Sequence, residues 1–169
     1  MTFEPVYMTD PMYDRLCRMI SAGYPNSCVC YIDRIVNPEL EERFRLYKES
    51  SQIKTELQLF HGTSEENMRA IAKTGFSVAF NRMSAYGKGT YLATRADISS
   101  RYAPPSSCEL SFMLVCRAAI GHACVGTSNM EIHPTFDCAV NDQTNPTIYV
   151  MPNDDSVIPQ YAIAFYKNA

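Results

Sequence analysis

The stretch LFHGTSEENMRAIAKTGF, residues 59–76, decides the fold because it carries the chain from strand-like sequence into a helix. Thr63 and Glu66 have the spacing of a capping box, which predicts that a helix begins at this point. His61 and Gly62 therefore fall at the junction between the strand and the helix. His61 is one of three histidines in the chain, and a ring at such a place can belong to the core, cap the helix or take part in chemistry.

Two similar helix starts lie upstream of this stretch. Asp10-Pro11 and Asn37-Pro38 each combine a good N-cap residue with a proline suited to the first helical position. Between the two predicted helices, residues 28–36, CVCYIDRIV, are rich in β-branched and aromatic side chains and predict a strand. The apolar residues of both helices recur at helical spacing, which indicates sides that face a core.

The second half of the chain predicts mostly strands. The segment YGKGTYLA, residues 86–93, enters a strand through two glycines, and a short helix is expected over residues 95–102. Further strand-like runs follow at residues 109–118, 147–151 and 161–166. Because strands dominate this half and helices are few, we expect an α+β fold with a mainly antiparallel sheet, not a doubly wound fold.

The composition limits the class of protein. With 169 residues, 46% of them hydrophobic and 20% charged, we expect one globular domain over residues 1–169. A formal net charge of -3 without a block of Lys and Arg argues against nucleic acid as a partner. No apolar run approaches the roughly 20 residues that span a bilayer, and the first residues lack a secretory signal. We therefore expect an intracellular protein, cytoplasmic or nuclear, without a membrane partner.

The cysteines do not form a metal-binding pattern. There are seven, and none belongs to a CxxC pair. Cys28 and Cys30 are two residues apart, which places them on one face of a strand rather than around a metal, and His122 with Cys124 is an equally poor set of ligands. Reduced thiols of an intracellular protein are the preferred interpretation, and no metal is expected.

Taken one at a time, the remaining candidate residues have ordinary explanations. A histidine at a junction is more often a core or capping residue than a ligand-binding one. Gly87 and Gly89 lack the spacing of a phosphate-binding loop. Tyr91 and Tyr102 can each be a buried aromatic with a bonded hydroxyl. Only their combination points to a function.

That combination resembles a known family. HGT at residues 61–63, YGKGTYLA, Ser99 with Tyr102, and NPTIYVMPNDDSVIPQYAIAFY at residues 145–166 occur in the order and spacing of the poly(ADP-ribose) polymerase superfamily's catalytic domain. The segment YIDRIVNPELEERF, residues 31–44, resembles the segment that precedes the histidine in mono-ADP-ribosyltransferase members, although their usual tryptophan after NPxL is absent. The resemblance extends from about residue 28 to the C-terminus.

The resemblance implies a fold, a ligand and a set of binding residues. The family's fold is a split pair of antiparallel sheets, flanked by a few helices, that holds NAD as a co-substrate in a cleft without a metal. By this resemblance His61 hydrogen-bonds the adenosine ribose, and the backbone of Gly62 binds the nicotinamide carboxamide. Ser99 donates to the carboxamide oxygen, and Tyr102 stacks on the nicotinamide. The full set implied to bind NAD is His61, Gly62, Thr63, Tyr91, Ala93, Ser99 and Tyr102.

The resemblance also implies a type of reaction. Where the polymerases have a glutamate that accepts from a ribose hydroxyl, this chain has Ile148. Isoleucine cannot act as a base, so the catalytic set His61, Tyr91 and Ile148 has the His-Tyr-Ile pattern of mono-ADP-ribosyltransferases. Ile148 can equally be a plain core residue of a sheet, and the two roles are compatible. Asp154 and Asp155 are interpreted as solvated turn residues and stay outside the predicted site.

The leading hypothesis is therefore an NAD-dependent transferase that attaches one ADP-ribose to protein acceptors, itself included, as a monomer. A catalytically inactive module that binds NAD, ADP-ribose or a protein is the alternative, and transfer to a nucleic-acid end is disfavoured by the acidic charge. Roughly sixty residues precede His61, too few for the helical regulatory domain of the DNA-damage polymerases. A fragment and a stand-alone protein both remain open. Residues 77–85 are expected to shape the NAD cleft as a mobile loop.

Overall fold

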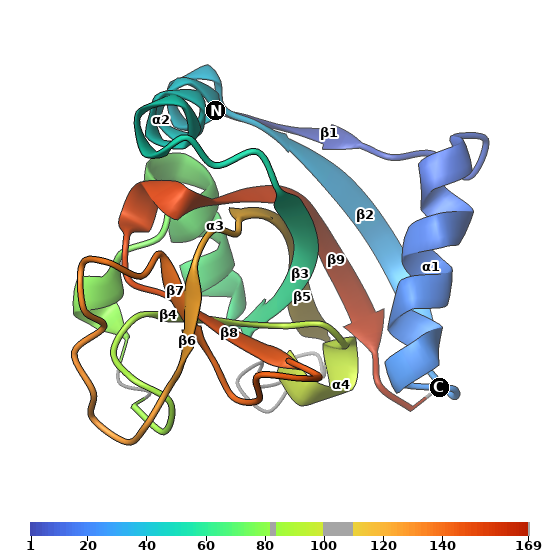
Figure 1. Cartoon of the computed structure of the whole chain (residues 1–169). Coiled ribbons are helices and arrows are strands. Elements are labelled where there is room, and N and C mark those ends of the chain that lie inside the picture. The colour runs from blue at the N-terminus through green and yellow to red at the C-terminus, as the bar shows by residue number, and fades with distance from the viewer. Residues whose placement is uncertain (82–83, 100–109, 169) are drawn as a thin grey trace.

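The computed structural model describes residues 1–81, 84–99 and 110–168, which form helices around one extended sheet (Figure 1). The helices are α1 (Pro11–Gly23), α2 (Pro38–Ser51), α3 (Glu65–Thr74) and α4 (Ala96–Ser99), with short 3-10 turns at η1 (Val78–Phe80) and η3 (Asp154–Ser156). The strands are β1 (Thr2–Pro5), β2 (Cys28–Val36), β3 (Glu56–Thr63), β4 (Thr90–Ala93), β5 (Ser111–Ala119), β6 (Ala123–Val125), β7 (Cys138–Val140), β8 (Ile148–Met151) and β9 (Val157–Tyr166).

The nine strands have the order β1-β2-β9-β5-β3-β4-β8-β7-β6. Every pairing is antiparallel except that between β6 and β7. The expectation of an α+β fold with a mainly antiparallel sheet is therefore confirmed. The joint between β3 and β4 differs from the others, because its register consists of one pair, Phe60 with Ala93. Through that joint the sheet divides into a larger and a smaller part.

The central strands are buried on both faces. Phe112 and Leu114 of β5 belong to the core cluster that includes α3, whereas Met113 and Val115 belong to the cluster that includes α1. This division follows from the alternation of side chains along a strand. In Figure 1, α1 lies beside β2 and β9, and α2 lies at the other side of the molecule, next to the N-terminus. β5, the neighbour of β3, is thus packed on both of its faces.

The two upstream helix starts are confirmed at the predicted residues. The side chain of Asp10 accepts a hydrogen bond of 2.9 Å from the Met12 N–H and caps α1. The side chain of Asn37 accepts from the Leu40 N–H at 3.3 Å and caps α2. Asn37 also donates its amide to the Ala72 carbonyl at 2.9 Å, so one residue joins the start of α2 to the end of α3.

The predicted capping box at the start of α3 is wrong. Ser64 is the N-cap, and its hydroxyl accepts from the Asn67 N–H at 3.2 Å. Thr63 instead ends β3, where it pairs with Phe112 and is 5% exposed. The ladder with β5 keeps the chain extended for longer than the local sequence indicates. His61 and Gly62 therefore lie inside a strand, not at its junction with the helix.

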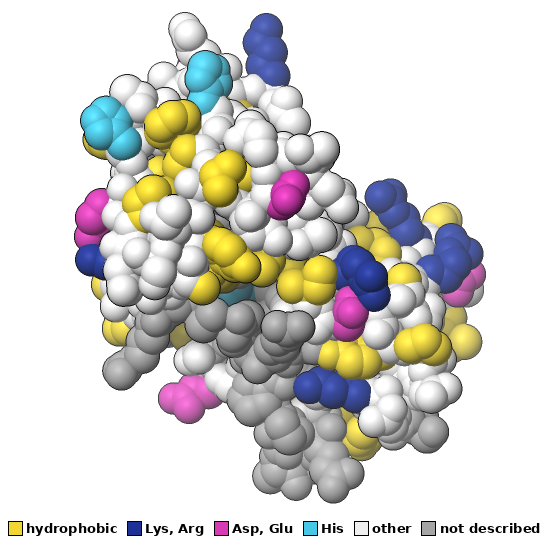
Figure 2. Space-filling model, turned by 60° about the horizontal axis from the view of Figure 1, so that its bottom comes forward, with side chains coloured by type: hydrophobic (Ala, Val, Ile, Leu, Met, Phe, Trp, Pro, Cys, Tyr) yellow, Lys and Arg dark blue, Asp and Glu magenta, His cyan; other side chains and the backbone are white. Residues whose placement is uncertain are grey.

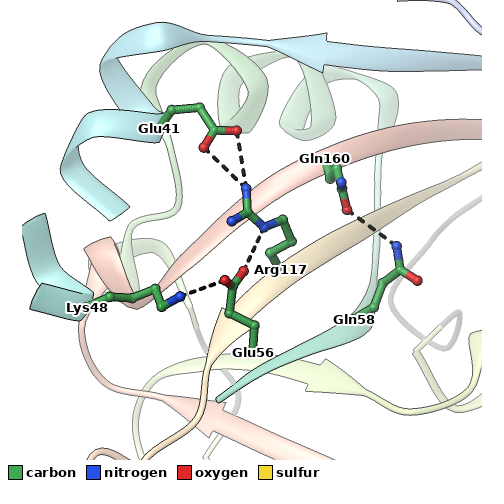
Figure 3. A network of polar contacts seen from close by, with 6 residues as sticks. All are labelled: Glu41, Lys48, Glu56, Gln58, Arg117 and Gln160. Atoms are coloured by element: carbon green, nitrogen blue, oxygen red, sulfur yellow. Dashed lines mark hydrogen bonds and ion pairs between the residues drawn. The ribbon is translucent and has the colours of Figure 1, made fainter. Parts of the chain in front are cut away.

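A polar network fastens α2 to the sheet (Figure 3). The Arg117 guanidinium donates to Glu56 at 2.7 Å and to Glu41 at 3.2 Å, and Lys48 donates to Glu56 at 2.6 Å. The guanidinium also lies 5.1 Å from the centre of the Phe44 ring. The hydrogen bond from Arg117 holds the pKa of Glu56 below its ordinary value, and Lys48 acts in the same direction, while burial opposes both. Ionised Glu56 therefore stabilises the fold.

We predict that Glu56→Gln lowers the free energy of unfolding at pH 7 by about 2 kcal/mol, because charge-assisted hydrogen bonds are lost. A carboxylate whose pKa is lowered in the folded state stabilises the fold above its ordinary pKa of about 4.3, and that stability is lost as the pH falls through the folded value. The difference between the two proteins should accordingly shrink in acid. Urea unfolding at pH 7 and at decreasing pH below 4 measures it.

The matched control is Glu49→Gln, since Glu49 pairs with Arg45 on the surface and its side chain is 70% exposed. An exposed pair of this kind contributes at most about 1 kcal/mol. A Glu56→Gln difference that stays the same size at acidic pH would contradict the role given to the Glu56 carboxylate.

Candidate active site

The site begins where β3 and β4 separate. Every residue of β3 from Glu56 to Thr63 pairs with β5, but the register with β4 consists of Phe60 with Ala93. Beyond this pair, the backbone groups of β3 that face β4 therefore do not belong to the ladder between these two strands. Backbone N–H and C=O groups need partners wherever they are buried, so this gap is a place where side chains or a ligand can supply them.

Gly62 presents its backbone to the gap. Its N–H donates to the Ser99 hydroxyl oxygen at 2.8 Å, and the Ser99 hydroxyl donates to the Phe60 carbonyl at 3.0 Å. In an antiparallel strand the N–H and C=O of one residue point to the same side, so the Gly62 carbonyl also faces this gap. Glycine adds no Cβ that would keep another group at a distance. A donor and an acceptor thus stand side by side, as a carboxamide requires.

His61 links the two strands through its ring. Its Nδ1 lies 2.8 Å from the Tyr91 carbonyl oxygen, which can only accept, so Nδ1 carries the proton and Nε2 is an acceptor in the neutral ring. Burial lowers the pKa of His61 below its ordinary value, although the bond to Tyr91 opposes this, and the ring is neutral at pH 7. The ring packs edge-on against Phe76, with centroids 5.0 Å apart.

A cavity of about 460 Å³ lies against these residues. Its volume is within the range of small-molecule sites, about 300–1,000 Å³. The walls come from the ends of β3 and β4, from α3 and from the segment after α3. They are formed by His61, Gly62, Thr63, Asn67, Ala70, Ile71, Thr74, Gly75, Phe76, Ser77, Phe80, Asn81, Thr90 and Tyr91.

The Tyr91 hydroxyl holds the YGKG turn in place. It donates to the Gly87 carbonyl at 2.6 Å and accepts from the Tyr86 N–H at 2.9 Å. Gly87 has φ 108°, a conformation that favours glycine. The side chain of Tyr91 is 6% exposed, and its backbone carbonyl bonds His61. Tyr91 therefore organises this edge of the site in addition to lining the cavity.

Ile148 lies on the other side of β4 from β3. It begins β8, pairs with Ala93 and packs with Tyr91 in one apolar cluster. Its N–H donates to the Asn141 side-chain oxygen at 3.0 Å, and the same oxygen accepts from the Thr147 N–H at 3.0 Å. Asn141 therefore closes the loop before β8 and fixes where Ile148 begins. Sequence reasoning missed Asn141, although it opens a turn-rich segment, NDQTNP.

The structure brings together most of the predicted site residues. His61, Gly62, Thr63 and Tyr91 line the cavity, and Ser99 lies against Gly62. Ala93 forms the joint between β3 and β4. Ile148 is not among the described residues that line the cavity. Tyr102 lies outside the described residues, so its predicted stacking on a ligand stays a prediction.

Asp154 and Asp155 form a turn and also bind residues from distant parts of the chain. They form η3 as the sequence indicates, but each carboxylate has a partner from a distant part of the chain. Asp154 accepts from the Val78 N–H at 2.8 Å, and Asp155 pairs with Arg43 at 2.7 Å. Neither partner could be found from the sequence, because they lie far away along the chain.

Within residues 1–81, 84–99 and 110–168, no group of three or more His, Cys, Asp or Glu side chains could hold a metal ion. None of the helices described there has the length and apolar character needed to cross a bilayer. On the face shown in Figure 2, hydrophobic side chains form a band, while Lys and Arg are scattered among acidic residues.

Comparison with known proteins gives a consistent result. Residues 18–161 match the family model of the poly(ADP-ribose) polymerase catalytic domain. Human protein mono-ADP-ribosyltransferase PARP14 is 27% identical over 177 residues, covering 94% of this chain and 10% of that protein. Mouse protein mono-ADP-ribosyltransferase PARP10 is 28% identical over 149 residues, covering 78% of this chain and 16% of that protein.

Mouse protein mono-ADP-ribosyltransferase PARP12 is 29% identical over 169 residues, covering 90% of this chain and 24% of that protein. The chain therefore spans between 10% and 24% of the length of these three relatives. The family match begins within α1 and ends within β9, and so includes both strands of the site and the residues that line the cavity. This chain belongs to the poly(ADP-ribose) polymerase catalytic-domain family.

Proposed function

We propose that this chain is an NAD-dependent transferase that moves one ADP-ribose unit onto a protein side chain and releases nicotinamide. The observation that carries the proposal is the backbone of Gly62, which faces the gap between β3 and β4 beside a cavity. The names of the three relatives, which are protein mono-ADP-ribosyltransferases, support the same activity. NAD is the co-substrate in this proposal.

The chemistry of the site fits the two ends of NAD. The nicotinamide carboxamide carries one acceptor and two donors, which match the N–H and the C=O of Gly62. Its oxygen would compete with Ser99 for the Gly62 N–H, and the Ser99 hydroxyl can turn to donate to that same oxygen. Neutral His61 offers Nε2 as an acceptor, which suits a ribose hydroxyl. Thr63 and Ala93 shape the surroundings, and Tyr102 is proposed to stack on the nicotinamide.

The reaction breaks the bond between nicotinamide and ribose. Positive charge leaves the pyridinium ring as that bond breaks and grows on the sugar. An aromatic ring stacked on the cation is therefore of most help in binding NAD, about 0.5–2 kcal/mol, and of less help in the transition state. Holding the carboxamide on Gly62 and the adenosine ribose on His61 fixes the nicotinamide and the ADP-ribose parts that separate, and this is how the site is proposed to lower the barrier.

The residue at position 148 sets the proposed extent of the reaction. Isoleucine offers no oxygen to accept from the ribose 2′-hydroxyl and no charge to oppose the growing positive charge. Chain extension requires a base for a sugar hydroxyl, and the proposed set His61, Tyr91 and Ile148 does not supply one. Transfer of one unit remains feasible where the acceptor side chain, or a carboxylate next to it, brings the negative group.

A non-catalytic binding module is the second candidate. The observation that favours it is the bond from the Gly62 N–H to the Ser99 hydroxyl, which occupies one of the proposed carboxamide-binding groups within the chain. A module of this kind would bind NAD or ADP-ribose weakly, or not at all, and would transfer nothing. The incubation described next separates the two functions.

Incubation with biotinylated NAD is expected to label the protein itself or proteins of a lysate, with the mass of one ADP-ribose per site. His61→Ala should reduce both labelling and NAD affinity about ten-fold, because the ribose hydroxyl loses its acceptor. His133→Ala is the matched control, since His133 is exposed and bonds Thr135 outside the cavity. Folded wild-type protein that gives no labelling, whether or not it binds NAD, would exclude the transferase and favour the binding module.

The pKa of His61 predicts how NAD binding depends on pH. Protonated His61 has donors at both nitrogens and cannot accept from a ribose hydroxyl. Because its pKa is lowered from the ordinary value near 6.5, affinity should hold down to pH 6.5 and decline only at lower pH. Calorimetric titration with NAD between pH 5 and 8 tests this, and the dependence should vanish in His61→Ala. A midpoint at or above pH 6.5 in the wild type would refute the assignment.

A further inference from the structure

We propose that Asp154 is a positioning residue, which holds residues 77–81 as one wall of the NAD cavity and places Phe80 against the bound dinucleotide. The inference rests on the proposed function, because it names NAD as the ligand of the cavity. It concerns a carboxylate that the sequence suggested was an ordinary turn residue, and an aromatic side chain of the segment expected to shape the cleft, which the predicted set of NAD-binding residues does not include.

The first observation is the location of the segment. Ser77, Phe80 and Asn81 line the cavity, across from the ends of β3 and β4. Phe80 is 87% exposed, the highest fraction among the exposed large hydrophobic side chains of the described residues. An aromatic ring at the rim of a cavity leaves water when a flat or apolar group lies on it, and this favours binding. NAD offers two flat rings of this kind.

The second observation is the weakness of the local structure around Phe80. The turn η1 has three residues, and its backbone bonds are Phe80 N–H to the Ser77 carbonyl at 3.3 Å and Asn81 N–H to the Val78 carbonyl at 3.1 Å. Such a short turn is not stable by itself. The bond from the Val78 N–H to the Asp154 carboxylate, at 2.8 Å, joins it to the body of the protein.

The third observation separates Asp154 from its neighbour. Asp155 pairs with Arg43 of α2, and Arg43 also donates to the Thr74 carbonyl at 3.3 Å. That contact fixes the end of α3, before Gly75 turns the chain with φ 86°. Asp154 acts further along, on the part of the segment that faces the cavity. The two carboxylates of η3 thus hold successive parts of one wall.

A binding consequence follows from these contacts. Without Asp154 the segment would sample other positions, and NAD would have to order it on binding, which lowers affinity. Loss of one hydrogen bond of this kind corresponds to about a five-fold weaker Kd. A small carboxamide such as benzamide reaches Gly62 without extending along the wall, so its affinity should not change.

The experiment compares five proteins by calorimetric titration with NAD and with benzamide, and by hydrogen exchange at the Val78 amide. Asp154→Ala should weaken NAD about five-fold, leave benzamide unchanged and speed exchange at Val78. Asp154→Asn should restore both properties, because its side-chain oxygen still accepts. Phe80→Ala should also weaken NAD selectively, whereas Phe136→Ala, at an exposed phenylalanine outside the cavity, should have no effect.

The outcomes distinguish the two proposals. Wild-type protein that binds no NAD overturns the proposed function, and with it this inference. Wild-type protein that binds NAD while Asp154→Ala binds it equally well overturns the inference alone. Equal losses for NAD and benzamide would show general damage to the fold and likewise overturn it. If Asp154→Ala does not fold, the comparison of Phe80→Ala with Phe136→Ala decides.

Discussion

The separation of β3 from β4 after the pair Phe60 and Ala93 is the constraint on which the rest of the structure depends. At this point the ladder between the two strands ends, and side chains bond backbone groups of both β3 and β4. The Ser99 hydroxyl accepts from the Gly62 N–H, and the His61 ring donates to the Tyr91 carbonyl. A hydrogen bond to a side chain can be replaced by a hydrogen bond to a ligand at a lower cost in free energy than a ladder bond can. No strand has to be displaced in the first case.

The remainder of the fold keeps this gap in place. β3 stays extended because each of its residues pairs with β5, which is itself buried on both faces. β4 is held from its other edge by β8, whose first residue is fixed by Asn141. Arg117 and Glu56 attach α2 to the sheet, and Asp154 attaches the segment after α3. The cavity is therefore lined by residues between positions 61 and 91 and held in place by contacts from more distant parts of the chain.

The local features of the fold could be predicted from the sequence, and the long-range ones could not. Asp10 and Asn37 cap helices as expected, because capping depends on neighbouring residues alone. Thr63 was assigned to a cap but ends a strand, since pairing with β5 overrides the local signal. The short strands β1, β6 and β7 were missed. The structural role of Asp154 was missed because its partner, Val78, lies 76 positions away along the chain.

The most direct test of the account is the amide resonance of Gly62 in a nitrogen-15 spectrum during titration with benzamide. A large, saturable shift of this resonance is expected, because the carboxamide oxygen replaces Ser99 as the acceptor of the Gly62 N–H. The resonance of Gly126, whose N–H bonds the Val140 carbonyl away from the gap, should not move. Saturable binding of benzamide that leaves the Gly62 resonance unchanged would contradict the central claim.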